Sequence, residues 1–586
     1  MRQCKKILLS GHTKNKEYLH RLYTDKQVYV SSLSSSKQPV AEEKRFLYQD
    51  LSFLFEGMGY RNMEKMVMYI FVPEKKLSYY QEMRSDVVAY EDFLLRMVSE
   101  PVNALSREYE NDYKSKREKP QFSMQSVHST VQRRNGCLYR EQEKVFRLRV
   151  HFMVPLIHGT YINGKSAFKA IRRILETVNE QVESIEGLAL ERHLRLYRHQ
   201  QEIRNYLQEN ELAAFVANGS ILPRSGETDL PMEQAVPFLA PPELERELVL
   251  SDGTRVTGMG IKKGVTVITG GGYSGKSTLL DSLEMGIFNH IEGDGREYVI
   301  TDQSACKIAA EDGRYIEETD LSPFFHFMSG KTSVHSFSTD WASGSVSQAA
   351  GIIEAVYGGC QLLLIDEDTS ATNFMIRDQN MRLLVQNEPI IPFTDRVREL
   401  SDRGISTILV IGGSSEYLRY ADEIILMEEY TAKCRTNFVK EGGLKIADYG
   451  KQSSGPFNEN GHWTEEKYRK DDQRDKTKDF YYSKCVKIEN ARFICIDNYL
   501  SDITKLTAIC SDGQSNSMAV LLEKIIAAAD GETDLYEQCK NVVRTLFEST
   551  AGTILSSRHQ YEFWLEEVRS VDVLLVVCRT RRNGRR

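Results

Sequence analysis

The chain has 586 residues, of which 41% are hydrophobic and 27% are charged, and its formal net charge is −7. This composition is typical of a soluble protein with several domains, and the negative charge excludes an overall basic field that would attract nucleic acid or membranes. No run of about 18 uncharged apolar residues predicts a transmembrane helix, and residues 1–10 make a poor signal peptide. The ten cysteines form no C-x-x-C pair, so we expect reduced thiols in a cytoplasmic protein, with no zinc site and no membrane partner.

The N-terminal region, residues 1–235, predicts an accessory domain of mixed α and β structure. Apolar spacing predicts helices over Tyr90–Val98, Ser166–Asn179 and Leu188–Gln208. Alternating polarity predicts a strand over Phe146–Pro155.

The predicted helix over Leu188–Gln208 alternates basic and aromatic side chains. These are Arg192, His193, Arg195, Tyr197, Arg198, His199, Arg204 and Tyr206. Such side chains together hold a single nucleic-acid strand through charge and base stacking. An exposed helix face without a ligand is the simpler interpretation, and we favour it.

Residues 236–435 predict a nucleotide-binding domain, which begins with a proline-rich linker and a β-hairpin. The hairpin strands are expected over Glu247–Leu250 and Arg255–Gly258, on either side of the turn Ser251–Thr254. A buried strand is expected over Val265–Thr269, and it leads directly into a glycine-rich loop.

This loop has the pattern G-x-x-x-x-G-K-S. It consists of Gly270, Gly271, Gly272, Tyr273, Ser274, Gly275, Lys276 and Ser277, and Thr278 continues into a helix. The strand–loop–helix context predicts a cradle of backbone N–H groups for the phosphates of ATP, assisted by the helix dipole. Lys276 is expected to reach the β- and γ-phosphates, and the Ser277 hydroxyl is expected to hold Mg²⁺.

A second buried strand, over Gln361–Ile365, ends in Asp366 and Glu367. Carboxylates at a strand end face the ligand crevice of an open α/β sheet. Asp366 is therefore the second predicted group for Mg²⁺, and Glu367 is the predicted catalytic base that orients and deprotonates the attacking water.

Together these motifs resemble those of the ABC-type ATPases, in which an L-S-G-G-Q signature precedes a helix that leads to D-E-P-T-S-A-L-D. Ser343 and Gly344 match the signature, Ser345 follows them, and Asp366–Glu367 and Thr369–Ala371 match the second motif. The resemblance implies an α/β fold with an ABC-type P-loop core, built from a mixed sheet, flanking helices and an antiparallel β-hairpin. It also implies a homodimer in the ATP-bound state. In such a dimer, Ser343–Ser345 of one chain cap the γ-phosphate held by the P-loop of the other chain.

The chain departs from that family pattern at several positions. Ser345 and Val346 replace the second Gly and the Gln of the signature, and Thr372–Asn373 replace Leu-Asp. Gly413 stands where the family has a switch histidine, and glycine cannot carry a proton as imidazole does. We therefore expect slow hydrolysis, and the alternative is a scaffold that clamps on ATP with negligible turnover. Asp302–Gln303, after a predicted strand, is the candidate Q-loop.

Within this class, the chain resembles the soluble group known as predicted ATPases of the ABC class. The resemblance rests on Ala214–Arg224, Arg255–Ile261, Ala310–Arg314 and Asp368–Asp378, and residues 1–88 diverge from it. The group has no settled biochemical role. We expect ATP to drive a conformational change on a macromolecule, with RNA or a nucleoprotein favoured, and the ATPase subunit of a transporter is the less favoured alternative.

Residues 436–586 predict a linker, a small α+β domain and a basic tail. Glu465–Asp479 is a charged stretch, Val571–Val577 predicts a final strand, and five arginines lie among residues 579–586. A basic tail without a ligand is favoured over one that contacts nucleic-acid phosphates.

Overall fold

The computed structural model describes residues 1–10, 12–14, 45–57, 64–77, 86–111, 119–226, 228–328, 333–377, 379–385, 387–443, 486–489, 492–496, 499–528, 534–547 and 563–582. The charged stretch Glu465–Asp479 and the last four residues of the basic tail lie outside these ranges. The chain divides into two compact units. The first contains Met1–Arg195 and Phe547–Glu567, and the second contains Leu196–Leu546 and Val568–Arg586.

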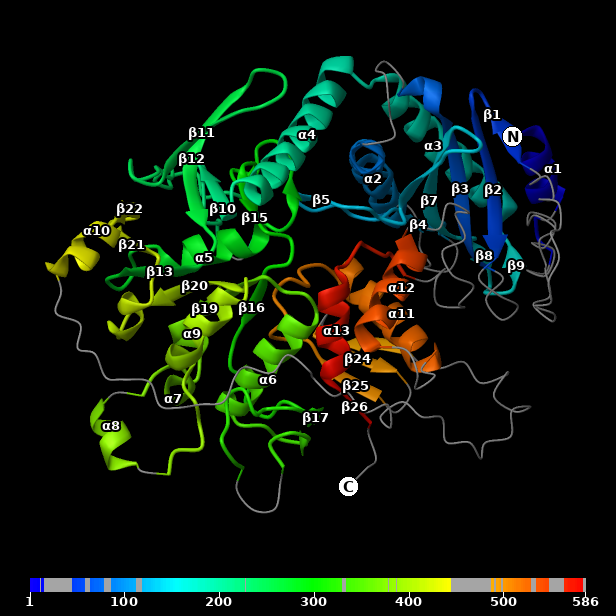
Figure 1. The fold of residues 1–586 in the computed structure, drawn as a ribbon. Helices are drawn as coiled ribbons and strands as arrows, with labels where there is room; N and C mark the ends of the chain where they lie inside the picture. Colours follow the sequence, from blue (N-terminus) through cyan, green and yellow to red (C-terminus); the bar gives the residue numbers. More distant parts are fainter. Residues whose placement is uncertain are drawn as a thin grey trace. The chain divides into compact units, whose positions relative to one another are not determined.

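An antiparallel sheet forms the centre of the first unit (Figure 1). Its strands follow the order β1 (Phe46–Tyr48), β2 (Leu51–Gly57), β3 (Lys65–Pro73), β7 (Val145–Met153) and β4 (Gln121–Ser123), and β6 (Cys137–Arg140) also pairs with β7. The helices of this unit are α1 (Arg2–Ser10), α2 (Val87–Asn111) and α3 (Gly164–Glu183), and a small hairpin joins β8 (Leu156–Ile157) to β9 (Tyr161–Ile162). The predicted strand over Phe146–Pro155 and the predicted helices over Tyr90–Val98 and Ser166–Asn179 are confirmed. The helix predicted over Leu188–Gln208 is α4 (Gly187–Glu209).

The second unit begins with an antiparallel sheet that carries the predicted hairpin. Its order is β11 (Glu245–Val249), β12 (Arg255–Lys262), β10 (Leu212–Ala217) and β15 (Val299–Thr301). Val249 lies opposite Arg255 in the register of the hairpin, so that prediction is confirmed.

A mixed sheet forms the core of the second unit. Its order is β16 (Cys306–Ile308), β19 (Leu362–Asp366), β20 (Ser406–Ile411), β13 (Val265–Gly270), β21 (Glu423–Glu428) and β22 (Thr431–Cys434). The first five strands are parallel, and β22 is antiparallel to β21. Strands β19 and β20 are fully buried, as is typical of parallel strands with both faces covered.

Helix α5 (Lys276–Met285) lies between the two sheets of this unit (Figure 1). Leu279, Leu280 and Leu283 share one buried cluster with Ile408 of the mixed sheet and Val216 of the antiparallel sheet. Each fully buried leucine contributes about 1.5–3 kcal/mol relative to an exposed one. This packing holds the helix start, and therefore the P-loop, in a constant position at the sheet edge.

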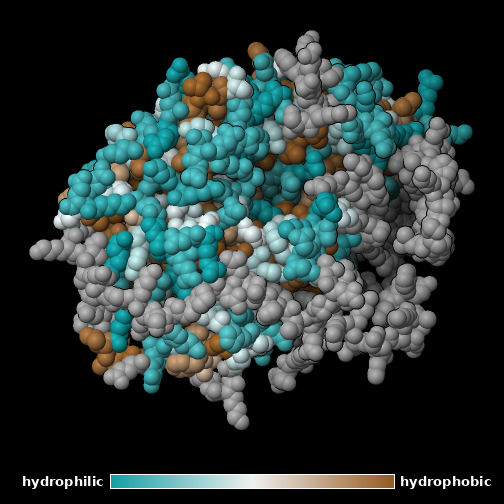
Figure 2. All heavy atoms as spheres, viewed as in Figure 1, coloured by the Kyte–Doolittle hydropathy of each residue, from teal (hydrophilic) through white to brown (hydrophobic). Residues whose placement is uncertain are grey.

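The remaining elements of this region connect the strands of the mixed sheet. They are β14 (Asn289–His290), the hairpin of β17 (Ile316–Thr319) and β18 (Phe337–Thr339), and the helices α6 (Gly344–Tyr357), α7 (Thr372–Met375), α8 (Gln379–Leu384), α9 (Phe393–Asp402) and α10 (Thr436–Phe438). Leu383 and Leu384 of α8 are exposed. Figure 2 shows apolar residues as separate groups on a largely hydrophilic face, one of them at the place of α8. No helix within the described ranges has the length and hydropathy needed to cross a membrane.

The C-terminal part of the second unit is a small α+β arrangement. A sheet of β23 (Val486–Glu489), β24 (Phe493–Ile496), β25 (Tyr499–Asp502) and β26 (Thr580–Arg582) lies with helices α11 (Asp512–Ala528), α12 (Leu535–Phe547) and α13 (Ser570–Cys578).

The strand predicted over Val571–Val577 is wrong, because these residues lie in α13. Every side chain from Val571 to Cys578 is buried. A helix that is buried on all sides has the same continuous apolar sequence as a buried strand, so periodicity cannot separate the two. The basic tail also begins later than predicted, because Arg579 is buried and Thr580–Arg582 form β26.

Candidate active site

The register of three parallel strands brings the predicted motifs to one edge of the mixed sheet. Thr269 of β13 lies beside Ile411 of β20, and Asp366 of β19 lies beside Val410. The P-loop, the Asp366–Glu367 pair and the turn after β20 therefore follow neighbouring strand ends. This is the edge at which open α/β sheets bind ligands.

The backbone of the P-loop requires glycine at two positions. Gly270 has φ 149° and Gly275 has φ 96°, and both values fall in the region that disfavours residues with a Cβ. A Cβ on Gly270 would lie 2.2 Å from the carbonyl oxygen of Met427 on β21. Tyr273 also has a positive φ, 57°, and its side chain is 98% exposed. The loop thus turns tightly over the start of α5, as a phosphate cradle must.

The Lys276 ammonium closes this loop on itself. Its Nζ donates to the carbonyl oxygens of Gly270, at 2.9 Å, and Gly271, at 2.6 Å. Ser274 is buried, and its hydroxyl has no hydrogen-bond partner among the described residues. Phosphate oxygens that enter the loop would offer Lys276 charged acceptors in place of two neutral carbonyls, and charge-assisted bonds are the stronger ones.

Two of the predicted site residues offer hard oxygen ligands. Asp366 is 6% exposed at the end of β19, and one of its carboxylate oxygens accepts the N–H of Asp368 at 3.2 Å. Ser277 is exposed in the first turn of α5. A carboxylate and a hydroxyl are the kind of protein oxygens that bind Mg²⁺ together with waters and phosphates, so these residues fit a Mg²⁺ ion that arrives with ATP.

Glu367 is held by the turn after β20. Its Oε2 accepts the N–H of Gly412 at 2.6 Å and the N–H of Gly413 at 2.8 Å. The sequence placed Gly413 where the family has a histidine, but it did not indicate this contact, because backbone amides are the same in every residue except proline. In the same turn, the Ser414 hydroxyl accepts the N–H of Glu416 at 3.2 Å.

The signature segment lies at the start of α6. Ser343 is the N-cap residue and is exposed, and its side chain makes no capping hydrogen bond. A Cβ on Gly344 would lie 3.1 Å from Asp312 and 3.6 Å from the Cβ of Ala371, so this helix end lies beside the loops that follow β16 and β19. Ser345 differs from the other two, because it is buried and its hydroxyl donates to Asn373 at 2.7 Å.

Gln348 joins α6 to the loop after Glu367, and sequence reasoning missed it. Its Nε2 donates to the Ser370 hydroxyl at 2.9 Å, and its Oε1 accepts the N–H of Ala371 at 2.9 Å. Gln348 is fully buried. The available signal was an amide side chain in a largely apolar helix, because a buried amide requires hydrogen-bond partners.

The proposed Q-loop at Asp302–Gln303 is wrong in position. Cys306 lies beside Leu363 and Ile308 lies beside Ile365 in a parallel pair, so β16 approaches the site edge only at its C-terminal end. Asp302–Gln303 precede this strand and therefore lie at the opposite edge. Asp302 there accepts the N–H and the hydroxyl of Ser304.

The basic and aromatic helix is only partly available to a ligand. Arg204 is buried and donates to the carbonyl oxygens of Thr301 and Phe288 at 2.9 Å and 2.8 Å. His199 is buried between Tyr298 and Asp252. Arg192, Arg195 and Arg198 are exposed. His199 and Arg204 thus form hydrogen bonds within the second unit, which contains α4 from residue 196 onward.

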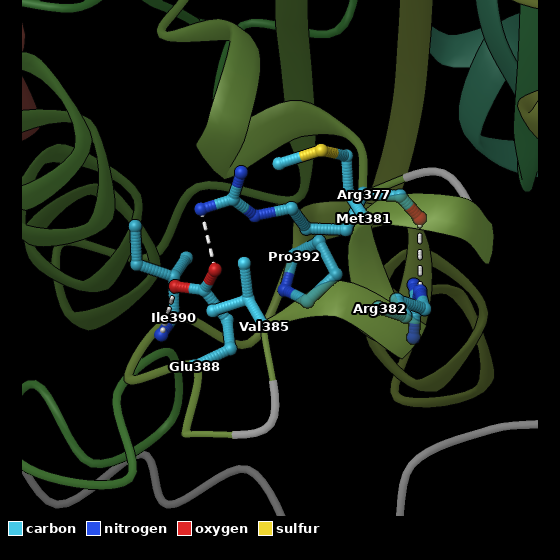
Figure 3. A pocket seen from close by; sticks show the side chains of 7 residues that line it. All are labelled: Arg377, Met381, Arg382, Val385, Glu388, Ile390 and Pro392. Atoms are coloured by element: carbon cyan, nitrogen blue, oxygen red, sulfur yellow. Dashed lines mark hydrogen bonds and ion pairs between the residues drawn. The ribbon is translucent and has the colours of Figure 1, made fainter.

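A small pocket lies beside α8, and its lining is shown in Figure 3. The Arg377 guanidinium points toward the Glu388 carboxylate and forms an ion pair with it. Arg382 donates to the Arg377 carbonyl oxygen at 2.8 Å and to Asp395. The guanidinium groups of Arg377 and Arg382 both form ion pairs with carboxylates of the protein. We therefore assign no ligand to this pocket.

Comparison with known proteins shows which family this part of the chain resembles. Residues 186–458 match the family model of the ABC_ATPase P-loop domain. The uncharacterized protein MJ1628 of Methanocaldococcus jannaschii is 32% identical over 247 residues, which are 40% of this chain and 54% of that protein. The chain thus spans about half the length of this curated relative.

Solved structures of ATP-binding cassettes also resemble the chain. MJ1267, an ATP-binding cassette of an ABC transporter, is 13% identical over 40% of this chain and 97% of that one, with a TM-score of 0.24. The protein cbiO1 of Clostridium perfringens, part of the ABC transporter complex cbiONQ, is 16% identical to this chain, and the match covers 40% of this chain and 92% of that one with a TM-score of 0.24. The chain is thus similar to the P-loop domain of the ABC_ATPase family over residues 186–458, which contain the P-loop, Asp366 and Glu367.

Proposed function

We propose that this chain is an ATPase that binds Mg·ATP at its P-loop, dimerises, and uses ATP binding and hydrolysis to drive a conformational change on a macromolecule. The observation that carries the proposal is the convergence of the P-loop, Asp366 and Glu367 at the ends of adjacent parallel strands. Each motif alone is weak, but their meeting at one sheet edge supports a single reaction centre.

In this proposal each residue has a separate task. The N–H groups of Gly270–Gly275 and the Lys276 ammonium bind the phosphates, and Thr278 continues the helix whose dipole favours them. Ser277 and Asp366 hold Mg²⁺, which when bound offsets phosphate charge. Glu367 accepts the proton of the attacking water.

A direct test measures steady-state Mg·ATP hydrolysis by wild type and Glu367→Gln across protein concentration. If Glu367 is the base, the variant loses at least about a hundredfold in kcat while its ATP affinity is retained. If the chain acts as a dimer, the specific activity of the wild type rises with concentration. Equal hydrolysis by the two proteins would remove Glu367 from its role.

Dimerisation with the signature in trans has its own test. Lys276→Ala disables the P-loop of a chain, and Ser343→Arg blocks the signature with a bulky cation. Each variant alone should be inactive. A mixture should recover activity, because one of the two sites in a mixed dimer combines the intact P-loop of one chain with the intact signature of the other. A mixture as inactive as its components would contradict the trans arrangement.

An ATP-gated clamp with negligible turnover is the second candidate function. The observation that favours it is the Gly412–Gly413 turn, which supplies amide donors but no imidazole near Glu367. A single-turnover experiment separates the two functions. Bound ATP that remains uncleaved over hours would favour the clamp, and conversion to ADP at a rate that Glu367→Gln abolishes would favour the ATPase.

The macromolecule on which we propose that the conformational change acts is RNA or a nucleoprotein. Three exposed cations support this part of the proposal, and they are Arg192, Arg195 and Arg198. Binding of single-stranded RNA should weaken as salt rises, because phosphate contacts release counterions. The triple change to Gln should flatten the salt dependence. RNA binding that is absent at low salt would overturn this part of the proposal.

A further inference from the structure

The two carboxylate oxygens of Glu367 lie in different environments. Oε2 accepts two backbone N–H groups, from Gly412 at 2.6 Å and from Gly413 at 2.8 Å. No hydrogen bond joins Oε1 to any residue that the structure describes. The carboxylate is thus fixed at one oxygen and open at the other.

The turn that supplies these amides has no side chain to crowd the open oxygen. A Cβ on Gly413 would lie 3.3 Å from Oε1, which is closer than most contacts of real Cβ atoms. A Cβ on Gly412 would lie 3.9 Å from Oε2, which is an ordinary contact distance. Neither glycine has a positive φ, so backbone conformation does not require glycine here. The constraint that remains is the space beside Glu367.

We propose that the Gly412–Gly413 amide pair is the positioning element of Glu367, fixing Oε2 so that Oε1 faces the attacking water. This inference rests on the proposed ATPase function. In the step that it serves, water gives a proton to Oε1 and its oxygen bonds to the γ-phosphorus. The bond from that phosphorus to the β–γ bridging oxygen breaks, and ADP leaves with the electron pair. The proton later passes from Glu367 to solvent.

The two amide donors hold the carboxylate without any side chain. A bond from a backbone N–H to a charged oxygen is stronger than one between neutral groups, so the pair fixes the orientation of Glu367 firmly. Gly413 stands where the ABC-type ATPases have a histidine, so fixed backbone dipoles take the place of an imidazole here. Such dipoles need no reorganisation during the reaction.

The test compares kcat and KM of Mg·ATP hydrolysis for wild type and a set of variants in this turn. Gly413→Pro removes one donor. We expect kcat to fall at least about tenfold with KM for ATP within about twofold of wild type, because the amides position the base and do not bind the nucleotide.

Gly413→Ala keeps the N–H and adds the crowding methyl group, so it covers the case in which the proline variant does not fold. Its kcat should fall further than that of Gly412→Ala, because a Cβ on residue 413 would lie 3.3 Å from Oε1 of Glu367, whereas a Cβ on residue 412 would lie 3.9 Å from Oε2. Ser415→Ala, an exposed side chain in the same turn, is the matched control and should match wild type.

The outcomes separate this inference from the proposed function. If wild type hydrolyses ATP and Glu367→Gln does not, but both Gly413 variants keep the kcat of wild type, the positioning role is overturned and the ATPase stands. A rise in kcat in Gly413→Ala also overturns it, because the amides would then hold Glu367 away from the water. If wild type does not hydrolyse ATP at all, the proposed function itself fails.

Discussion

Arg579 donates to both carboxylate oxygens of Glu311, with its Nε 3.1 Å from Oε2. Glu311 lies in the loop after β16, and its N–H donates to the Ser347 hydroxyl of α6 at 2.8 Å. The third guanidinium nitrogen of Arg579 lies 3.7 Å from Glu354 of the same helix. Residues from the end of the chain are thus tied by charge to the helix that carries the signature segment.

The first prediction concerns this buried network. Burial alone would raise the pKa of Glu311, but the charges of Arg579 and Arg314 keep it below its ordinary value. Arg579→Met should therefore lower the free energy of unfolding by about 3 kcal/mol, because it leaves buried carboxylates with one cation fewer. Urea unfolding of the full chain measures this change.

Arg255→Met is the matched control for Arg579. Its partner is Glu247, and both side chains of that pair are largely exposed, at 68% and 50%. Removing one partner of an exposed pair costs less than about 1 kcal/mol. Equal effects of the two substitutions would show that the Arg579 network adds nothing to the stability of α6 and its neighbours.

The second prediction concerns the P-loop glycines. Gly270→Ala should weaken binding of a fluorescent ATP analogue by at least about tenfold, which is 1.4 kcal/mol. The added Cβ meets the Met427 carbonyl oxygen at 2.2 Å, and Gly270 cannot move away because it lies beside Met427 in the β13–β21 pair. Gly271→Ala should cost less, since nothing lies within 4 Å of its added carbon. The reverse order would mean that the loop rearranges before it binds ATP.

The third prediction concerns Gln348. Gln348→Leu should reduce the free energy of unfolding by about 1–3 kcal/mol, because the half-buried Ala371 N–H loses its acceptor and the Ser370 hydroxyl keeps only its bond to the Asp366 carbonyl oxygen. It should also lower kcat without changing ATP affinity, since the loop after Glu367 loses its tie to α6. Calorimetry and steady-state kinetics measure the two effects. A variant that is stable and fully active would show that the amide has no role in fixing that loop.

The fourth prediction is a pH dependence in the first unit. The rings of His151 and Trp564 stack with centroids 3.9 Å apart. Burial, with a smaller contribution from Arg149, lowers the pKa of His151 to about 3 from its ordinary 6.5. Below pH 6.5 the unfolded state therefore binds a proton that the folded state refuses, so stability is lost as pH falls from 6.5 toward 3.

His151→Phe keeps an aromatic ring against Trp564 and removes the titration. Hydrogen exchange of residues 563–567 should show that wild type loses more protection than His151→Phe between pH 7.5 and pH 5, after correction for intrinsic exchange rates. Glu91, whose pKa burial raises to about 7, changes stability in the opposite direction. It is present in both proteins and so cancels from the difference. Equal losses in the two proteins would contradict the assignment to His151.

Several secondary-structure elements that the sequence predicted are found at the same residues in the structure. Val265–Ser277 predicted a strand, a loop and a helix start correctly, because each is set by neighbours within a few residues. Asp366 and Glu367 were expected at a strand end for the same reason. The roles of these residues, the Mg²⁺ ion, the homodimer and the domain boundaries at 235/236 and 435/436 stay predictions.

Sequence by itself thus determined the strand, glycine-rich loop and helix start over Val265–Ser277, the strand that ends at Asp366 and the α/β class of the core, since local patterns of glycine, apolar and acidic residues specify them. The tertiary structure alone decided that Val571–Cys578 form a buried helix, that Arg579 meets Glu311, and that Gly412 and Gly413 hold Glu367. These pairs are separated by tens to hundreds of residues. The contact with Glu367 is also made by backbone amides, which leave no mark in the side-chain sequence. Packing between segments that are far apart in the sequence, rather than local composition, brings such groups together.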